Sequence, residues 1–143
     1  MKQQKYRVIQ YGLGPIGCGT ARHVLERNNL QLVGAVDIDP AKAGKDVGEV
    51  IGLDRKLGIA VLPKISEVLK LTQADAVIHT TSSYFDLFEA QIVEILENGL
   101  NIVSTSEELS FPWLAHSEEA KRIDAAATKA GRTVLGTGVN PGF

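Results

Sequence analysis

The sequence predicts an α/β fold, a doubly wound parallel sheet of the Rossmann type with helices on both faces in three α/β/α layers. Short apolar runs typical of buried strands alternate with segments of helical periodicity along the whole chain. The first apolar run leads directly into a glycine-rich turn, which in such folds joins the first strand to the first helix. Strands and helices that alternate at this spacing imply right-handed crossovers, and therefore parallel strands.

The first unit of this fold carries a dinucleotide-binding fingerprint. A predicted strand at 6–11 is followed by a complete G-x-G-x-x-G turn made of Gly12, Leu13, Gly14, Pro15, Ile16 and Gly17. The first glycine permits the turn, the second leaves room for a pyrophosphate, and the third lets the helix pack against the sheet. Pro15 suits the first helical turn, whose free N–H groups attract phosphate. A second predicted strand at 30–36 ends at Asp37, whose carboxylate can accept the hydroxyls of an adenosine ribose.

This pattern predicts that the chain binds NAD or NADP. NAD is favoured because no arginine follows Asp37, and because Asp37 and Asp39 would repel the 2′-phosphate of NADP. Lys42 and Lys45 partly offset that repulsion, so use of both cofactors stays open. The alternative explanation of Asp37 is a surface residue that begins an Asx turn before Pro40.

The remaining elements continue the alternation. A glycine-rich loop with a short helical piece is expected at 40–52. Further strands are predicted at 59–62, 74–81, 100–104 and 133–137, and helices at 65–71, 85–97 and 115–130. Asn98 and Gly99 are expected to end the helix at 85–97 in the left-handed conformation, and the helix at 115–130 is expected to end at Gly131.

Ligands of open parallel sheets bind beyond the carboxyl ends of the strands, so the residues that follow each strand are candidates. These stretches are 12–17, 37–39, 79–84, 104–108 and 136–143. His79, Thr80 and Thr81 are predicted to contact the cofactor where its pyrophosphate and nicotinamide ribose pass. The alternative for His79 is a local hydrogen-bonding role rather than acid or base chemistry, and Ser82 or Ser83 can cap the next helix.

A pair of acids follows the fifth strand. Glu107 and Glu108 are candidate catalytic residues, because carboxylates at the mouth of the sheet suit recognition or deprotonation of an ammonium-bearing substrate. The alternative is helix capping, since Ser104 with Glu107 and Thr105 with Glu108 match the capping-box spacing. Any helix begun here would be short, because Phe111-Pro112-Trp113 follows closely.

Composition narrows the classes of function. The chain has 143 residues, a single domain's length, and its net charge of -2 with no basic cluster argues against nucleic-acid binding. Its one cysteine, Cys18, excludes an internal disulfide and a cysteine-based metal cluster, and we predict no metal site. A chain without disulfides fits a reducing compartment, so we predict a cytoplasmic protein. No run approaches the roughly 18 apolar residues of a membrane helix, and the start of the chain has no signal-like apolar segment.

Four blocks of the sequence resemble a known enzyme family. They are the glycine fingerprint with Asp37, the run 43–49, the block 104–109 with 111–113, and the terminal block 136–143. Together they resemble the 2,4-diaminopentanoate dehydrogenase family of native amine dehydrogenases, whose amino-terminal domain is similar to that of dihydrodipicolinate reductase. The resemblance covers essentially the whole chain.

The resemblance implies NAD(P)-dependent oxidative deamination of 2,4-diaminopentanoate, or a related amine, to 2-amino-4-oxopentanoate and ammonia, a step in ornithine degradation. It also implies an essential glutamate near the amine, which maps to the Glu107 and Glu108 pair; we favour Glu107. Asn140 and Pro141 would line the nicotinamide side of the cofactor, unless they form a plain Asn-Pro turn.

The resemblance further implies how the protein is organised. Family members continue beyond the block at 140–143 into a second domain that supplies the substrate pocket and oligomer contacts. We therefore expect residues 1–143 to be the cofactor-binding domain, the full-length protein to be a homo-oligomer, and the isolated domain to turn over little or no amine. Two alternatives stay open, a dihydrodipicolinate reductase-like imine reductase and a non-catalytic dinucleotide-sensing module.

Overall fold

The strands form one parallel sheet. A computed structural model describes residues 4–138, in which six strands lie in the order β3-β2-β1-β4-β5-β6, and every neighbouring pair is parallel. Their bounds are β1 (Tyr6–Tyr11), β2 (Leu30–Val36), β3 (Val61–Leu62), β4 (Ala76–His79), β5 (Asn101–Ser104) and β6 (Val134–Gly136). The strand order reverses beside β1, which is the arrangement expected for a doubly wound sheet.

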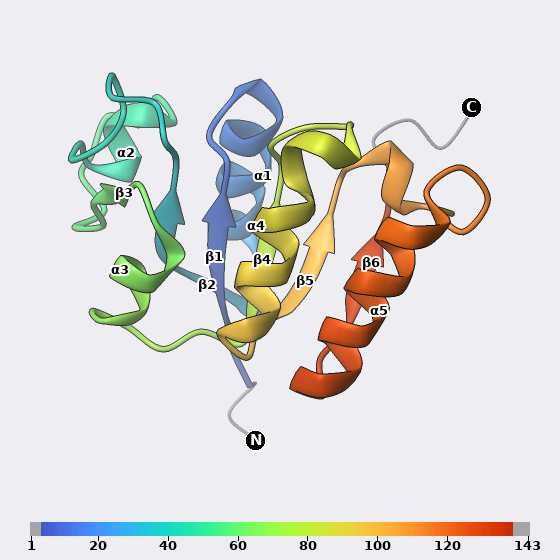
Figure 1. The fold of residues 1–143 in the computed structure, drawn as a ribbon. Helices are drawn as coiled ribbons and strands as arrows, with labels where there is room; N and C mark the ends of the chain where they lie inside the picture. Colours follow the sequence, from blue (N-terminus) through green and yellow to red (C-terminus); the bar gives the residue numbers. More distant parts are fainter. Residues whose placement is uncertain (1–3, 139–143) are drawn as a thin grey trace.

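Helices cover both faces of this sheet, as Figure 1 shows. They are α1 (Pro15–Glu26), α2 (Val47–Val50), α3 (Ile65–Leu69), α4 (Phe85–Glu97), α5 (Ser117–Ala130) and a short 3-10 helix, η1 (Glu107–Leu109). One core cluster joins the sheet to α1 and α2, and the other joins it to α3, α4 and α5. Adjacent residues of β1 point into different clusters, Val8 into the first and Ile9 into the second. The predicted three-layer α/β fold is therefore confirmed.

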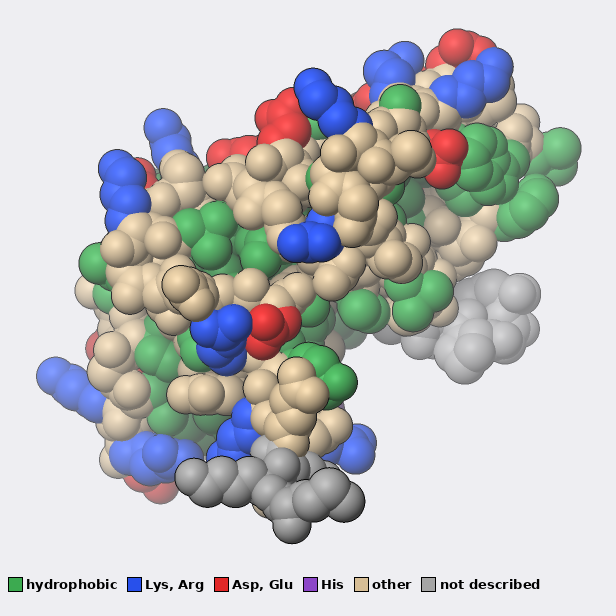
Figure 2. Space-filling view, turned by 90° about the horizontal axis from the view of Figure 1, so that it is seen from below, with side chains coloured by type: hydrophobic (Ala, Val, Ile, Leu, Met, Phe, Trp, Pro, Cys, Tyr) green, Lys and Arg blue, Asp and Glu red, His purple; other side chains and the backbone are tan. Residues whose placement is uncertain are grey.

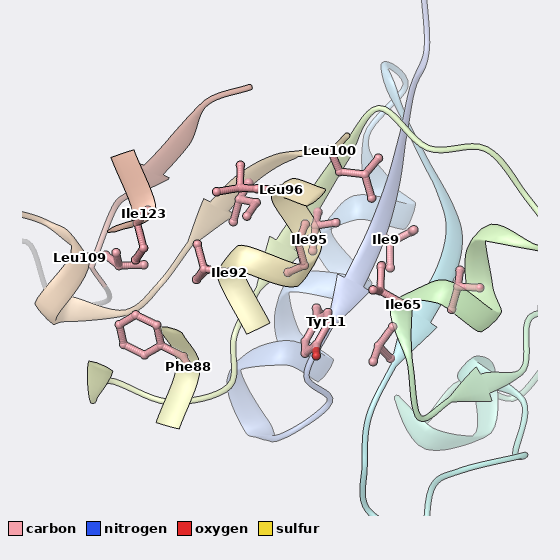
Figure 3. Close-up of a cluster of buried hydrophobic side chains, with 14 of the residues drawn as sticks. Ile9, Tyr11, Ile65, Phe88, Ile92, Ile95, Leu96, Leu100, Leu109 and Ile123 are labelled. Atoms are coloured by element: carbon pink, nitrogen blue, oxygen red, sulfur yellow. The ribbon is translucent and has the colours of Figure 1, made fainter. Parts of the chain in front are cut away.

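The longest apolar stripe belongs to α4 and packs against the middle of the sheet (Figure 3). Its members recur at helical spacing and are at most 1% exposed: Phe85, Phe88, Ile92, Ile95 and Leu96. Burial of five such side chains contributes on the order of 1.5–3 kcal/mol each. This packing fixes α4, and with it the polar side chains that α4 presents to the ends of β1 and β4.

Some predicted boundaries differ from those of the structure. The strand expected at 59–62 contains only Val61 and Leu62, because the preceding two residues pair with the segment before α2 instead: the Val47 N–H donates to the Ile59 carbonyl at 2.8 Å. The predicted left-handed end of α4 is confirmed, with φ of 77° at Gly99. The last helix ends before Gly131 as expected, and Gly131 is also left-handed, with φ of 63°.

Figure 2 views the molecule from the end at which the strands begin. Lys and Arg side chains are spread over this face with Asp and Glu between them. Within residues 4–138, no helix has both the length and the apolar character needed to cross a bilayer.

Candidate functional site

The glycine turn between β1 and α1 is closely packed on one side and open on the other. A Cβ added at Gly12, whose φ is 96°, would collide with the Thr80 carbonyl, and one added at Gly17 would collide with the Gly12 carbonyl. An added Cβ at Gly14 would have nothing within 4 Å. Pro15 begins α1 as expected, and both Pro15 and Ile16 are exposed. The turn therefore leaves open space in front of the free N–H groups of α1.

A buried polar network sets the shape of this turn. The Gln10 amide donates to the Gly12 carbonyl at 3.0 Å and to the Thr80 hydroxyl at 2.9 Å. The Thr80 hydroxyl itself donates to the Gly12 carbonyl at 3.0 Å, and the Thr20 hydroxyl donates to the Gln10 side-chain oxygen at 2.9 Å. Thr80 thus stabilises the turn through its hydrogen bond to the Gly12 carbonyl. Sequence reasoning missed Gln10, although a glutamine inside an otherwise apolar strand was a signal of such a network.

Asp37 joins the end of β2 to the glycine turn. Its Oδ2 accepts the Leu13 backbone N–H at 2.8 Å, and its Oδ1 accepts the Asp39 N–H at 2.9 Å. The second contact is an Asx turn, but the Asp37 side chain is only 13% exposed, so it is not the surface residue of the alternative explanation. The Lys42 ammonium lies 3.8 Å from Asp37 Oδ2 and donates to the Leu13 carbonyl at 3.0 Å.

A cavity of about 290 Å³ lies in front of these groups. It runs across the ends of β2, β1 and β4 and is lined by Tyr11, Gly12, Leu13, Gly14, Val36, Asp37, Ile38, Lys42, Thr80, Thr81 and Gln91. Asp37 and Lys42 lie at the β2 end, the glycine turn lies in the middle, and Thr81 and Gln91 lie at the β4 end. A larger hollow of about 620 Å³ follows the sheet face beside α1, and its lining includes none of the glycine turn or Asp37.

His79 lies beneath the cavity rather than in its wall. The side chain is fully buried, with its ring 5.6 Å from that of Tyr11 and 5.9 Å from that of Phe88. Its Nδ1 lies 2.9 Å from the Ser104 hydroxyl, and its Nε2 lies 2.8 Å from Gln91 Oε1. Burial lowers the pKa of His79 below its usual range, and the hydrogen bond with Gln91 opposes this only in part. Of the three residues predicted here to contact the cofactor, Thr80 and Thr81 line the cavity, and of these Thr81 is the exposed one.

The two glutamates after β5 have different surroundings. Glu108 Oε2 accepts the Phe85 N–H at 2.8 Å and lies 3.3 Å from His116 Nε2, so Glu108 caps the first turn of α4. Glu107 is exposed, and within residues 4–138 its carboxylate has no hydrogen-bond or ion-pair partner. The capping-box explanation is wrong, because η1 has no side-chain cap. The Ser104 hydroxyl, expected there, accepts the Ser106 N–H at 3.1 Å instead.

Asn140 and Pro141 lie outside the described residues. Among residues 4–138, no three His, Cys, Asp or Glu side chains converge as a candidate metal centre.

A family model described as the CoA binding domain matches residues 3–105, more than half of the chain. The chain belongs to this family. The matched residues include β1 to β5, and therefore the glycine turn and Asp37.

Individual relatives support the resemblance drawn from the sequence. The chain is 30% identical to 2,4-diaminopentanoate dehydrogenase of Acetoanaerobium sticklandii, over 98% of its own length and 40% of the relative's. It is similar to the solved amine dehydrogenase from Mycobacterium smegmatis, with 36% identity, a TM-score of 0.87, and coverage of 92% of this chain and 39% of that one. The similarity to 2,4-diaminopentanoate dehydrogenase and to amine dehydrogenases is thus confirmed, and the chain spans about 40% of the relative's length.

A third similar protein was solved with a nicotinamide cofactor. The WlbA dehydrogenase from Chromobacterium violaceum, in complex with NADH and UDP-GlcNAcA, is 27% identical with a TM-score of 0.69, over 96% of this chain and 36% of that one. These similarities associate this member of the family with dehydrogenases that use nicotinamide dinucleotides.

Proposed function

We propose that this chain is the NAD(P)-binding domain of an amine dehydrogenase that oxidatively deaminates 2,4-diaminopentanoate or a related amine. The observation that carries the proposal is the cavity in which Asp37 and the open side of the glycine turn face the same space. The amine dehydrogenases similar to this chain over most of its length support the reaction class.

The residues around the cavity fit a dinucleotide from the β2 end to the β4 end. Asp37 has accepted two N–H groups, and a carboxylate has about four acceptor positions, so it can still accept ribose hydroxyls. A pyrophosphate fits beside Gly14, where no atom lies within 4 Å of an added Cβ and the N-terminus of α1 offers N–H donors. The second nucleoside would then extend over β4, toward Thr81.

Charge at the β2 end favours NAD over NADP. Asp37 and Asp39 both lie near the ribose position, and Lys42 is the cation that approaches both, at 3.8 and 3.7 Å. Lys45 is directed elsewhere, since its ammonium lies 3.7 Å from Glu49. One lysine between two carboxylates leaves the site with net negative charge, which disfavours a 2′-phosphate.

The surroundings of the two glutamates support different roles for them. Thr81 lines the end of the cavity where the nicotinamide would be held, and that group would supply the acceptor for a hydride from the amine-bearing carbon of the substrate. Glu107, whose carboxylate has no protein partner among residues 4–138, would hold the substrate ammonium and take one proton to give the neutral amine. Once the exposed Glu107 side chain has released this proton to solvent, its carboxylate would again be anionic and would stabilise the positive iminium that forms when the hydride leaves. Water then adds to the iminium carbon before ammonia leaves. Glu108 is occupied by Phe85 and His116 and serves to hold the loop in place.

Calorimetric titration of the 143-residue protein tests the cofactor assignment. We expect saturable binding of NADH, weaker binding of NADPH, and a loss of NADH affinity in Asp37→Ala. CoA is the informative competitor, because the family is described by CoA binding and CoA also carries adenosine and a pyrophosphate. Binding of CoA without binding of NADH or NADPH would contradict the proposal.

The reaction itself is tested on the full-length gene product. NAD-dependent release of ammonia from 2,4-diaminopentanoate is expected, and a panel of related amines defines the substrate. Cofactor binding without turnover of any amine or imine would favour a dinucleotide-sensing module instead.

A further inference from the structure

Gln91 is the side chain of α4 that reaches the cavity, and its carbonyl end is fixed. Its Oε1 lies 2.8 Å from His79 Nε2 and accepts the Thr81 hydroxyl proton at 2.7 Å. Thr81 Oγ1 also lies 3.0 Å from His79 Nε2, so the three side chains form a closed triangle. Gln91 is partly buried and lies on the same face of α4 as the buried residues Phe88 and Ile95.

The proton positions in this triangle follow from the chemistry of its members. Gln91 Oε1 can only accept a hydrogen bond, so His79 Nε2 must carry a proton. The Ser104 hydroxyl already accepts the Ser106 N–H at 3.1 Å, so its own proton is available for His79 Nδ1 at 2.9 Å. The neutral imidazole is thus satisfied on both sides, and its Nε2–H holds the Gln91 oxygen inward.

This arrangement leaves both N–H groups of the Gln91 amide nitrogen available as hydrogen-bond donors. Among residues 4–138 this nitrogen has no protein acceptor within hydrogen-bonding distance. If it were buried it would be an unsatisfied polar atom, and the described residues contain no buried side-chain nitrogen or oxygen without a partner. The nitrogen is therefore accessible, and Gln91 forms part of the cavity wall. A side chain whose oxygen is anchored by two donors presents its NH₂ group in one fixed direction.

The order of the strands decides which part of a ligand this amide can meet. In the sheet, β1 lies between β2 and β4. Asp37 follows β2, the glycine turn follows β1, and Thr81 with Gln91 lies at the β4 end of the cavity. A dinucleotide with its adenosine at Asp37 and its pyrophosphate at the glycine turn brings its second nucleoside to Gln91.

We propose that the Gln91 amide donates a hydrogen bond to an oxygen of the nicotinamide half of the dinucleotide, and that His79 is a positioning residue that orients Gln91. The inference rests on the proposed function, because it requires a dinucleotide in this cavity. It gives the buried His79 a role that acts only through another side chain.

The test compares two ligands on the 143-residue protein, NADH and ADP. ADP retains the adenosine and pyrophosphate but has no second nucleoside. Gln91→Met removes the amide donors with little change in side-chain length, and it is expected to raise the Kd for NADH about fivefold while the Kd for ADP changes less than about twofold. Gln31→Met is the matched control, since Gln31 is exposed at the start of β2, and neither Kd should change.

Double-mutant analysis tests the positioning role. His79→Leu should produce the same selective loss for NADH, and the variant that combines it with Gln91→Met should bind no more weakly than Gln91→Met alone. His79→Gln retains a donor toward Gln91 and should recover part of the affinity. Additive losses in the double variant would overturn the positioning role. Gln91→Met affects a partly exposed side chain, so it decides the amide contact even where His79 variants do not fold.

The outcomes separate this inference from the proposed function. Wild-type protein that binds ADP but not NADH would overturn both. Wild-type protein that binds NADH with an affinity unaffected by Gln91→Met would overturn only the role of Gln91. Equal losses for NADH and ADP would place the donor on the adenosine or pyrophosphate half and overturn the assignment made here.

Discussion

The Leu13 backbone N–H donates to the Asp37 carboxylate at 2.8 Å, which ties the glycine turn to the end of β2. Asp37 therefore holds the turn in addition to any contact that it makes with a ribose. Removal of its carboxylate should therefore disturb the turn as well as any contact with a ribose.

We predict that Asp37→Ala weakens NADH binding about tenfold and lowers the free energy of unfolding by about 1–2 kcal/mol, since the Leu13 and Asp39 N–H groups lose a charged acceptor. Asp37→Asn keeps one acceptor oxygen and should lose less stability. Calorimetry and urea denaturation measure the two effects. Full stability together with full affinity in Asp37→Ala would contradict this assignment.

The glycines of the turn should separate folding from binding. Gly17→Ala is expected to lower the free energy of unfolding by about 2 kcal/mol or more, because its Cβ meets the Gly12 carbonyl and the Thr80 hydroxyl. Gly14→Ala should leave the fold intact and lower the free energy of unfolding by about 1 kcal/mol or less, because Gly14 is the N-cap of α1. It should weaken NADH binding, because its methyl group enters the space proposed for the pyrophosphate.

Gly19→Ala is the matched control for both glycine variants. Gly19 lies within α1, and nothing lies within 4 Å of an added Cβ. Its substitution should raise stability by roughly 0.5–1 kcal/mol and leave NADH affinity unchanged. Equal stability losses at positions 14, 17 and 19 would show that the packing described for the turn is not what constrains it.

Stability should fall as the pH falls below about 6.5, the ordinary pKa of histidine. The folded state lowers the pKa of His79, so the unfolded chain binds the proton first. The free energy of unfolding therefore decreases between pH 6.5 and the lower folded-state pKa, by at most about 1.4 kcal/mol per pH unit. Denaturant titrations at pH 7.5 and 5.5 measure the slope, and a folded His79→Gln variant should flatten it. An identical slope in that variant would assign the effect to other groups.

The two glutamates should respond differently to neutralisation. Glu108→Gln is expected to lower the free energy of unfolding by about 1 kcal/mol, because it removes a negative charge from the N-terminus of α4 and its contact with His116. Glu107→Gln should leave stability within about 0.5 kcal/mol of the parent, as is usual for exposed sites. Thermal denaturation of the 143-residue protein compares them.

The same pair should show the opposite order in catalysis. In the full-length gene product, Glu107→Gln is expected to lower kcat for amine oxidation by about 100-fold, the lower end of the range for loss of an acid or base. NADH affinity should not change. If Glu108→Gln loses activity without losing stability while Glu107→Gln remains active, the roles proposed for the two residues are reversed.

Local patterns in the sequence were sufficient to predict the fold. The glycine turn, the apolar strands and the stripe of α4 each depend on residues close together in the chain, and the structure has them where they were expected. Strand ends were less predictable, because Ile59 pairs with Val47 through a loop contact that periodicity does not contain.

The contacts of the candidate site depend on residues far apart in the sequence. Glu108 caps a helix that begins 23 residues earlier, at Phe85, so a capping rule that looks only three residues ahead assigned it to the wrong helix. His79 bonds to Ser104, 25 residues away, and to Gln91, 12 residues away. Its burial follows from packing between Tyr11 and Phe88, which the residue type alone does not indicate.

The hydrogen bonds that link Gln10 to Gly12 and Thr80 all lie within the protein. The loop in front of them thus has its final form before any nucleotide arrives, and little conformational entropy remains to be lost upon association. Amide exchange in this loop should accordingly differ little between the free and liganded states, and association should be limited by diffusion and orientation rather than by a slow rearrangement.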